Sequence, residues 1–374
     1  MDFNIGVVSG DGIGPEVVGE GIRALEAVGT RWGHKFTFRH GLIGGIAIDQ
    51  EGEALSDATV DMCRASDGVL LGAVGGPKWD SPSARTRPEV GLLKLRSDLQ
   101  LFANIRPVVN FRQLVDSTPL KPEVVRGVDM VVIRELTGGL YFGKPKRRWQ
   151  TSRGRRAVDT LHYTENEVTR VLRFGFSLAE ARRKSLTSVD KANVLESSRM
   201  WREIATELAP EYPTVELKHM LVDTCAMNMI KTPKQFDVIV TENTFGDILT
   251  DEAAVLAGSM GMLPSASLGG KALAKRWATG NGRVLGVYEP IHGSAPDIAG
   301  KDIANPIATV MSVAMMLRYS LGLPDEAAAV EEVVDSVLSL GYRTVDIANG
   351  NAKVVGTREM GGIIADRLRT GATA

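Results

Sequence analysis

Residues 4–28 read NIGVVSGDGIGPEVVGEGIRALEAV, and this stretch indicates the fold class. Its first five residues, Asn4–Val8, are rich in β-branched side chains and predict a strand. The apolar spacing over Glu16–Val28 predicts a helix. A second apolar run, Gly68–Val74, leads into glycines in the same way and predicts another strand. Short strands that alternate with longer helices predict an α/β protein.

Two more helices are predicted from their first residues. Thr164 and Glu167 form a capping box, in which each side chain satisfies a backbone N–H of the first turn. Pro324 suits the first position of another helix. Its apolar residues recur at helical spacing: Val330, Val333, Val334, Val337 and Leu338. Two charged stretches, Trp149–Arg156 and Lys271–Arg283, are predicted to be solvated loops or insertions.

Length and composition favour an ordinary globular protein. The 374 residues exceed the usual size of one hydrophobic core, so two domains are expected. A net charge of −1 excludes a broad positive field for nucleic acid or an anionic membrane. No apolar run reaches the length of about 18 residues that a membrane span needs. The start is also unlike a signal peptide, so a cytoplasmic protein is expected.

The two cysteines, Cys63 and Cys225, lie far apart and have no metal-binding spacing. Buried thiols of this kind are common in a reducing compartment, and no disulfide is expected.

Asp247 and Asp251 are four residues apart, so a helix would place both carboxylates on one face, with Cβ atoms about 6 Å apart. Such a pair suits Mg²⁺ or Mn²⁺, which prefer oxygen ligands. The alternative is an exposed acidic helix face. Asp223 is a candidate third ligand, although its distance in the sequence leaves this open.

Three arginines, Arg96, Arg106 and Arg134, lie in apolar or glycine-bearing stretches rather than in charge runs. Guanidinium groups bind carboxylates in bidentate fashion, so three that converge would suit a dicarboxylate. The alternative is three independent surface arginines.

Tyr141 and Lys191 each follow an apparent strand, which is where binding sites of α/β proteins lie. A lysine with a lowered pKa can take a proton from a hydroxyl group, and a tyrosine can return one to carbon. For either residue alone, a structural role is the alternative.

A glycine- and proline-rich loop, Glu289–Gly300, precedes a helical pattern and can wrap an adenosine. His292 can stack on adenine. Asp297 can accept hydrogen bonds from the ribose hydroxyls and repel a 2′-phosphate, which favours NAD over NADP. A structural turn is the alternative. Gly10–Gly14 is only a near miss of the dinucleotide-binding fingerprint, so a Rossmann fold is not predicted.

Five motifs in this order resemble those of the β-decarboxylating dehydrogenases, the isocitrate/isopropylmalate dehydrogenase type. They are Gly10–Glu16, Leu71–Asp80, Arg134–Gly139, Phe245–Asp251 and His292–Asp297. The resemblance implies a non-Rossmann α/β fold of two domains. One, over 1–101 plus 258–374, binds the cofactor, and the other, over 102–257, carries the substrate, metal and dimerisation regions.

The resemblance also implies an active site in the cleft between the domains of a homodimer. Lys191 and Asp223 would enter the partner's cleft, and each cleft's own chain would supply Arg96, Arg106, Arg134, Tyr141, Asp247 and Asp251. Asp223, Asp247 and Asp251 would hold Mg²⁺ or Mn²⁺. The implied NAD site comprises Ile13, Glu289, His292, Gly293, Ser294, Ala295, Asp297, Ile298 and Asn305.

The likeness is closest to members that convert 3-isopropylmalate to 4-methyl-2-oxopentanoate and CO₂ in leucine biosynthesis. The implied substrate pocket contains Glu89, Leu92, Leu93 and the partner's Val194. Burying an isopropyl group against the two leucines is worth roughly 2 kcal/mol. Lys94 departs from the small or apolar residue expected there and is predicted to face solvent.

The resemblance implies that Lys191 removes the hydroxyl proton and Tyr141 protonates carbon after CO₂ leaves. Two alternatives remain at this point: a sister enzyme for D-malate or tartrate, and a catalytically silent regulatory relative.

Overall fold

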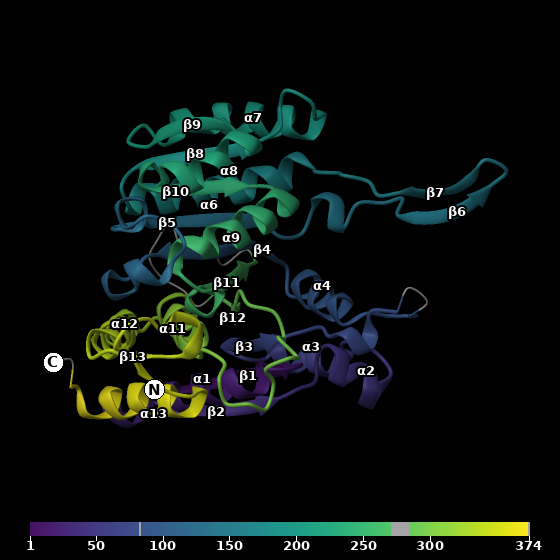
Figure 1. Cartoon of the computed structure of the whole chain (residues 1–374). Coiled ribbons are helices and arrows are strands. Elements are labelled where there is room, and N and C mark those ends of the chain that lie inside the picture. The colour runs from purple at the N-terminus through teal and green to yellow at the C-terminus, as the bar shows by residue number, and fades with distance from the viewer. Residues whose placement is uncertain (82–83, 271–283, 373–374) are drawn as a thin grey trace. The chain divides into compact units, whose positions relative to one another are not determined.

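The computed structural model describes residues 1–81, 84–270 and 284–372 (Figure 1). The chain divides into two compact units. Unit 1 consists of Met1–Leu101, Val109–Gly127 and Ala254–Ala374, and unit 2 consists of Phe102–Val108 and Val128–Ala253. The segment Val109–Gly127 therefore packs with unit 1, whereas the predicted middle domain included it.

Unit 1 is a layered α/β structure. Its helices and strands are β1 (Asp2–Gly10), α1 (Gly14–Trp32), β2 (Lys35–His40), α2 (Gly45–Glu51), α3 (Asp57–Arg64), β3 (Gly68–Ala73), α4 (Pro88–Asp98), α5 (Pro122–Val125), β11 (Pro264–Gly269), β12 (Gly286–Pro290), α11 (Ile307–Met316), α12 (Pro324–Ser339), β13 (Tyr342–Arg343), β14 (Lys353–Val354) and α13 (Thr357–Thr370). Its main strands run in the order β2-β1-β3-β12-β11. All pairs in this order are parallel except β11 with β12.

The core of unit 1 follows from the apolar patterns in the sequence. The strand predicted over Asn4–Val8 is part of β1, and the helix predicted over Glu16–Val28 is the middle of α1. The predicted helix that Pro324 opens is α12, and its apolar row is fully buried. Burying each valine in such a row contributes roughly 1.5–3 kcal/mol. The predicted α/β class is confirmed.

Unit 2 is a second α/β structure. Its elements are β4 (Leu101–Val109), β5 (Asp129–Glu135), the 3-10 turn η3 (Gly139–Tyr141), β6 (Arg147–Thr151), β7 (Gly154–Val158), α6 (Glu165–Ala181), β8 (Ser185–Asp190), α7 (Glu196–Leu208), β9 (Glu216–Leu221), α8 (Val222–Lys231), β10 (Val238–Thr241) and α9 (Asn243–Ala257, whose last turn belongs to unit 1). Its main strands run in the order β4-β5-β10-β8-β9. β10 is parallel to β5 and β8, and β8 is parallel to β9.

The capping box predicted before α6 is confirmed. The Thr164 backbone N–H donates to the Glu167 carboxylate at 2.8 Å, and the Glu167 N–H donates to Thr164 Oγ1 at 3.4 Å. These two bonds satisfy donors that the first turn of a helix otherwise leaves unpaired. The local sequence therefore fixes where α6 begins.

Trp149–Arg156, which was predicted to be a solvated loop or insertion, is solvated but lies in a hairpin rather than a loop. β6 and β7 pair in antiparallel register, with Trp149 opposite Arg156, and form a hairpin that projects from the other elements of unit 2 (Figure 1). Most of its side chains are exposed on both faces, so the sequence lacks the alternation that marks a half-buried strand. The loop predicted over Lys271–Arg283 lies outside the described residues.

Cys63 and Cys225 are both buried and free. Burial raises the pKa of each thiol to about 12, so both stay protonated at neutral pH. None of the helices in the described ranges is long and apolar enough to cross a membrane.

The parallel strands of unit 2 position its polar residues. β5, β8 and β10 end at Glu135, Asp190 and Thr241, and the carboxyl ends of neighbouring parallel strands meet at one edge of a sheet. Arg134 is the partner of Thr241 in the ladder between β5 and β10. Arg134 near the end of β5, Lys191 after β8 and Asn243 after β10 lie at this edge and belong to the site described below.

Candidate active site

Arg106 lies on β4, with a side chain that is only 7% exposed. Its Nε donates to Asn104 Oδ1 at 2.6 Å, and its Nη1 donates to Thr250 Oγ1 at 2.6 Å. Asn104 is two residues earlier on the strand and so lies on the same face. Both acceptors are neutral and orient the guanidinium group, whose positive charge also faces the carboxylates of Asp247 and Asp251.

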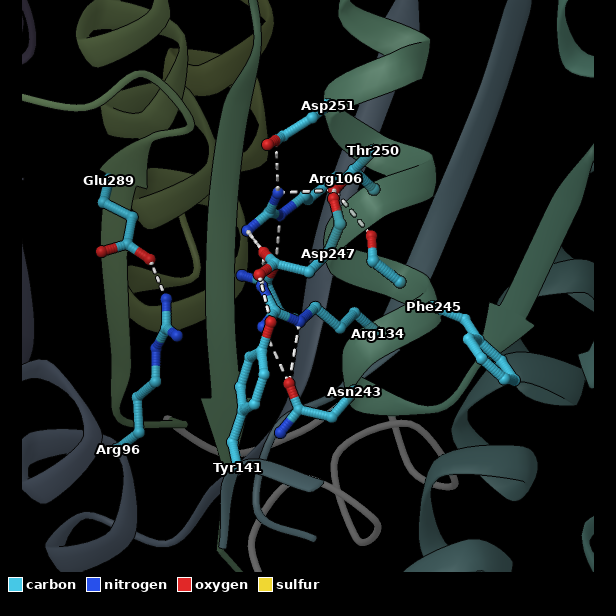
Figure 2. Close-up of polar contacts among 12 residues, drawn as sticks. Arg96, Arg106, Arg134, Tyr141, Asn243, Phe245, Asp247, Thr250, Asp251 and Glu289 are labelled. Atoms are coloured by element: carbon cyan, nitrogen blue, oxygen red, sulfur yellow. Dashed lines mark hydrogen bonds and ion pairs between the residues drawn. The ribbon is translucent and has the colours of Figure 1, made fainter. Parts of the chain in front are cut away.

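Arg134 is held from two sides near the end of β5. Its Nε and Nη2 donate to Asn243 Oδ1 at 3.0 and 2.8 Å, and its Nη1 donates to the Asp247 carboxylate (Figure 2). The side chain is 4% exposed. The Asn243 amide therefore orients the guanidinium group at Nε and Nη2, and the Asp247 carboxylate orients it at Nη1.

Asp247 and Asp251 project from one face of α9 toward the arginines (Figure 2). Arg106 approaches both, with Nη2 4.0 Å from Asp247 Oδ1 and Nη1 3.9 Å from Asp251 Oδ1. Partial desolvation raises the pKa of Asp251, whose side chain is still 60% exposed; the neighbouring Asp247 charge adds to this shift, and Arg106 opposes it. A cation close to Asp247 and Asp251 would therefore stabilise the charged forms of both carboxylates.

Tyr141 closes this cluster from η3. Its hydroxyl donates to Asp247 Oδ2 at 2.9 Å, and the Arg134 guanidinium carbon lies 5.7 Å from its ring centre. Burial and the bond to Asp247 raise the pKa of Tyr141 to about 12. The phenol therefore keeps its proton at neutral pH and can act as a proton donor.

A buried carboxylate supports the loop that leads to Tyr141. Glu135 is fully buried, and its carboxylate accepts from the N–H groups of Thr137 at 2.9 and 3.0 Å and of Gly138 at 2.8 Å. Arg170 lies 3.6 Å from it. Burial raises the pKa of Glu135.

Lys191 directly follows β8, and its Nζ lies 3.0 Å from Asp223 at the start of α8. This ion pair lowers the pKa of Asp223. The Lys191 N–H donates to Ser198 Oγ at 3.0 Å, which fixes the backbone here. Within the described residues, no three acidic, histidine or cysteine side chains form a metal-binding group, so Asp223 does not join the pair on α9 in a single chain.

The predicted substrate residues of unit 1 lie on α4. Arg96 is buried and donates to Glu289 of β12 at 2.6 Å, an ion pair with both side chains 7% exposed. Glu89 is exposed, and Leu92 and Leu93 are half-buried. Leu92 packs partly against the core of this unit.

The predicted orientation of Lys94 agrees with its contacts. Its Nζ donates to the Leu55 carbonyl at 3.0 Å and to Asp57 at 2.6 Å. Asp57 is 91% exposed at its side chain, so the Lys94 charge is directed to the surface of unit 1.

The loop after β12 carries the predicted cofactor residues and packs on the glycine turn after β1. The Ile13 N–H donates to the Ser294 carbonyl at 2.8 Å. Gly12 has a positive φ of 57°, and a Cβ there would lie 1.9 Å from that carbonyl oxygen, so only glycine fits. Ile298 packs beside Ile13, and Asp297 is exposed.

His292 belongs to this loop, and Asn305 follows it in the sequence. His292 Nε2 is buried and has no hydrogen-bond partner in the described part of the chain. Burial lowers the pKa of His292, which favours the neutral ring. Asn305 is buried and donates to Asp346 at 3.1 Å, and its side-chain oxygen accepts from the Ile307 N–H at 3.0 Å.

The sequence matches the family model described as isocitrate/isopropylmalate dehydrogenase over residues 4–364. The chain belongs to this family.

Among relatives in the isocitrate/isopropylmalate dehydrogenase family, the chain is 58% identical to a 3-isopropylmalate dehydrogenase of Dehalococcoides mccartyi, over 98% of this chain and 100% of that protein. It is 56% identical to one of Carboxydothermus hydrogenoformans, over 99% and 96% of the two chains. A solved isocitrate dehydrogenase of Methylococcus capsulatus matches with a TM-score of 0.82 at 34% identity, over 98% of this chain and 99% of that one.

Three polar residues contact Arg106 or Arg134 but were not predicted from the sequence. They are Asn104, Asn243 and Thr250. The contact of Asn104 with Arg106 could have been predicted, because alternate residues of a strand share a face and Arg106 lies two residues after Asn104. Thr250 and Asn243 reach arginines more than 100 positions away in the chain. No spacing rule connects such pairs.

Proposed function

We propose that this protein oxidises 3-isopropylmalate with NAD and releases CO₂, forming 4-methyl-2-oxopentanoate for leucine biosynthesis in the cytoplasm. The observation that carries the proposal is the cluster beside α9, where two buried arginines, a tyrosine and two carboxylates meet. Such a cluster suits a hydroxy dicarboxylate. The relatives named 3-isopropylmalate dehydrogenase, at 54–58% identity, support this substrate.

The substrate's side chain would contact Leu92 and Leu93 of α4. Both leucines are half-buried, so each keeps apolar surface for a ligand. Burying an isopropyl group there is worth roughly 2 kcal/mol, which favours it over a methyl group. Glu89, one turn earlier on α4, and Val194 of the partner subunit would complete the pocket.

Asp247 and Asp251 fit a divalent cation. Both are carboxylates on one helix face, and the Asp251 side chain is 60% exposed and so accessible to an ion. Together with Asp223 of the partner subunit they would hold Mg²⁺ or Mn²⁺, which when bound supplies Lewis-acid polarisation of the substrate's oxygen atoms.

The loop from Glu289 to Ile298 fits NAD, which when bound supplies the hydride acceptor. The unpartnered buried Nε2 of His292 fits a polar ligand such as adenosine. The exposed Asp297 carboxylate would accept hydrogen bonds from the ribose, and Ile13 and Ile298, which belong to one apolar cluster, would form an apolar floor. Gly293, Ser294, Ala295 and Asn305 would complete this site.

Asp297→Lys is expected to lower kcat/KM for NAD by about 10- to 100-fold, because a hydrogen bond to a charged group contributes about 1.5–3 kcal/mol. Steady-state kinetics with NAD and NADP measure this effect. Lys301→Ala, a nearby change at an exposed residue, is the control. Unchanged use of NAD by Asp297→Lys would contradict the assignment.

The protein's own residues would move two protons. Lys191 takes the proton of the substrate's hydroxyl group, so that the hydride can leave the same carbon. After CO₂ departs, Tyr141 delivers a proton to the carbon that carried it. Arg96, Arg106 and Arg134 orient the carboxylates throughout. One proton is removed and one is returned, so the sequence of steps balances.

The proposed site draws on residues of two subunits. Arg96 and the NAD loop belong to unit 1, and the α9 cluster belongs to unit 2. In a homodimer, Lys191 and Asp223 would enter the partner's site. The exposure of Val194 (61%), Met227 (64%) and Ile248 (63%) supports association through unit 2.

Mixed dimers give a prediction for this shared site. Lys191→Met and Tyr141→Phe are each expected to be nearly inactive alone. When they are mixed under conditions that exchange subunits, about a quarter of the wild-type activity should return, because half the dimers carry one intact site. The CO₂ release rate of the mixture measures this. An absence of recovery despite verified exchange would contradict a shared site.

The proposed function is tested by NADH formation from 3-isopropylmalate with purified protein, NAD and Mn²⁺ or Mg²⁺. We expect one CO₂ per NADH, loss of activity on treatment with a chelator, and its return when the cation is added back. An absence of NADH formation with either cation would contradict the proposal.

A further inference from the structure

We propose that Asn243 is a positioning residue that fixes Arg134 and the loop of Tyr141 in one mutual arrangement. The proposal rests on the substrate-binding role of Arg134 and the acid role of Tyr141 given above. Asn243 lies between the two, at the junction of β10 and α9.

Both ends of the Asn243 amide are used. Its oxygen accepts from Arg134 Nε at 3.0 Å and Nη2 at 2.8 Å, and its nitrogen donates to the Gly138 carbonyl at 3.1 Å (Figure 2 shows the contact with Arg134). The reversed amide would set an N–H group against a guanidinium that has only donors. The side chain therefore has one satisfactory orientation.

Asn243 is itself held firmly. It is 1% exposed, and its backbone N–H donates to Tyr163 Oη at 2.9 Å. Glu242, the preceding residue, accepts from the Phe245 N–H at 2.7 Å and anchors the first turn of α9. A buried side chain on an anchored helix start is a precise support.

The other end of the bridge holds the loop of Tyr141. Gly139 has a φ of 77°, and a Cβ there would lie 2.5 Å from Tyr163 Oη, so this loop packs closely on the Tyr163 ring. Tyr141 is two residues further on, in η3. The carbonyl that Asn243 holds thus lies in the turn that determines where the Tyr141 hydroxyl points.

A neutral amide suits this position better than a carboxylate. An aspartate would accept from Arg134 but could not donate to the Gly138 carbonyl, and it would place another negative charge close to Asp247. Asn243 orients Arg134 on one edge without cancelling the charge that the substrate carboxylate needs.

The test compares Asn243→Ala and Asn243→Asp with the wild-type dimer. Both variants are expected to raise KM for 3-isopropylmalate at least tenfold. Both should also lower the CO₂ released per NADH in the first turnover, because the arginine and the tyrosine lose their common support. The aspartate variant preserves side-chain size and serves if the alanine variant folds poorly.

Thr241→Val is the matched control. Thr241 is fully buried at the same junction and donates to the Val189 carbonyl at 3.0 Å. Its substitution removes a buried hydrogen bond and is expected to lower Tm while KM and the CO₂-to-NADH ratio stay at wild-type values. Asn243 variants that behave like this control would overturn the proposal.

A crystal structure of Asn243→Ala gives a readout that does not depend on turnover. A displaced Arg134 guanidinium or Gly138 carbonyl supports the proposal, and unmoved positions of both overturn it. Wild-type protein that does not oxidise 3-isopropylmalate would contradict the proposed function, whereas this structure would still decide the positioning role.

Discussion

Tyr141→Phe is expected to slow CO₂ release by about 100- to 10,000-fold, the usual contribution of a positioned general acid, while first-turnover NADH formation falls far less. The pKa of about 12 keeps this phenol protonated, and its hydroxyl lies 2.9 Å from Asp247 within the arginine and carboxylate cluster. Phenylalanine keeps the ring but has no proton to give. Rapid-quench measurement of CO₂ and NADH separates the two steps.

The control for this variant is Tyr212→Phe. Tyr212 lies in the same unit and stacks on Phe176 at a centroid distance of 4.8 Å, without a role in the site. It should retain wild-type rates for both steps. Equal losses of NADH formation and CO₂ release in Tyr141→Phe would argue against a specific role in protonating carbon.

Arg106→Gln is expected to lower kcat/KM for 3-isopropylmalate by roughly 30- to 5,000-fold, because a buried substrate carboxylate loses its charged partner. This factor corresponds to a loss of about 2–5 kcal/mol in transition-state stabilisation. Arg106 is buried, its Nε and Nη1 donate to neutral acceptors, and Asp247 and Asp251 approach it no closer than 3.9 Å. Steady-state kinetics at saturating NAD measure the effect.

Arg173→Gln is the matched control for that change. Arg173 is 44% exposed at its side chain and pairs with Glu211 on the surface of the same unit. Its replacement should alter kcat/KM by less than about 0.5 kcal/mol, as is usual for a surface site. A change of similar size in Arg106→Gln would remove Arg106 from the proposed substrate site.

Local signals predicted much of the fold. The capping box of Thr164 and Glu167, the proline that opens α12 and the β-branched start of β1 each act within a few residues, and the structure bears out all three. The pair on α9 was also predictable, because four residues along a helix return to one face. These features depend on short-range geometry alone.

The contacts that build the site could not be predicted in this way. Arg96 pairs with Glu289, 193 positions away, and Arg134 is held by Asn243, 109 positions away. Only the folded arrangement of strands brings such residues together. The hairpin of β6 and β7 was missed for a different reason: exposed arginines on both faces hide the strand pattern.

Selection of 3-isopropylmalate by this site is tested most directly by kcat/KM for NADH formation. The comparison uses 3-isopropylmalate, D-malate, isocitrate and homoisocitrate with the same cation and saturating NAD. We predict a preference for 3-isopropylmalate of at least about tenfold, or 1.4 kcal/mol, from burial of the isopropyl group against Leu92 and Leu93. A preference for D-malate would contradict this selectivity.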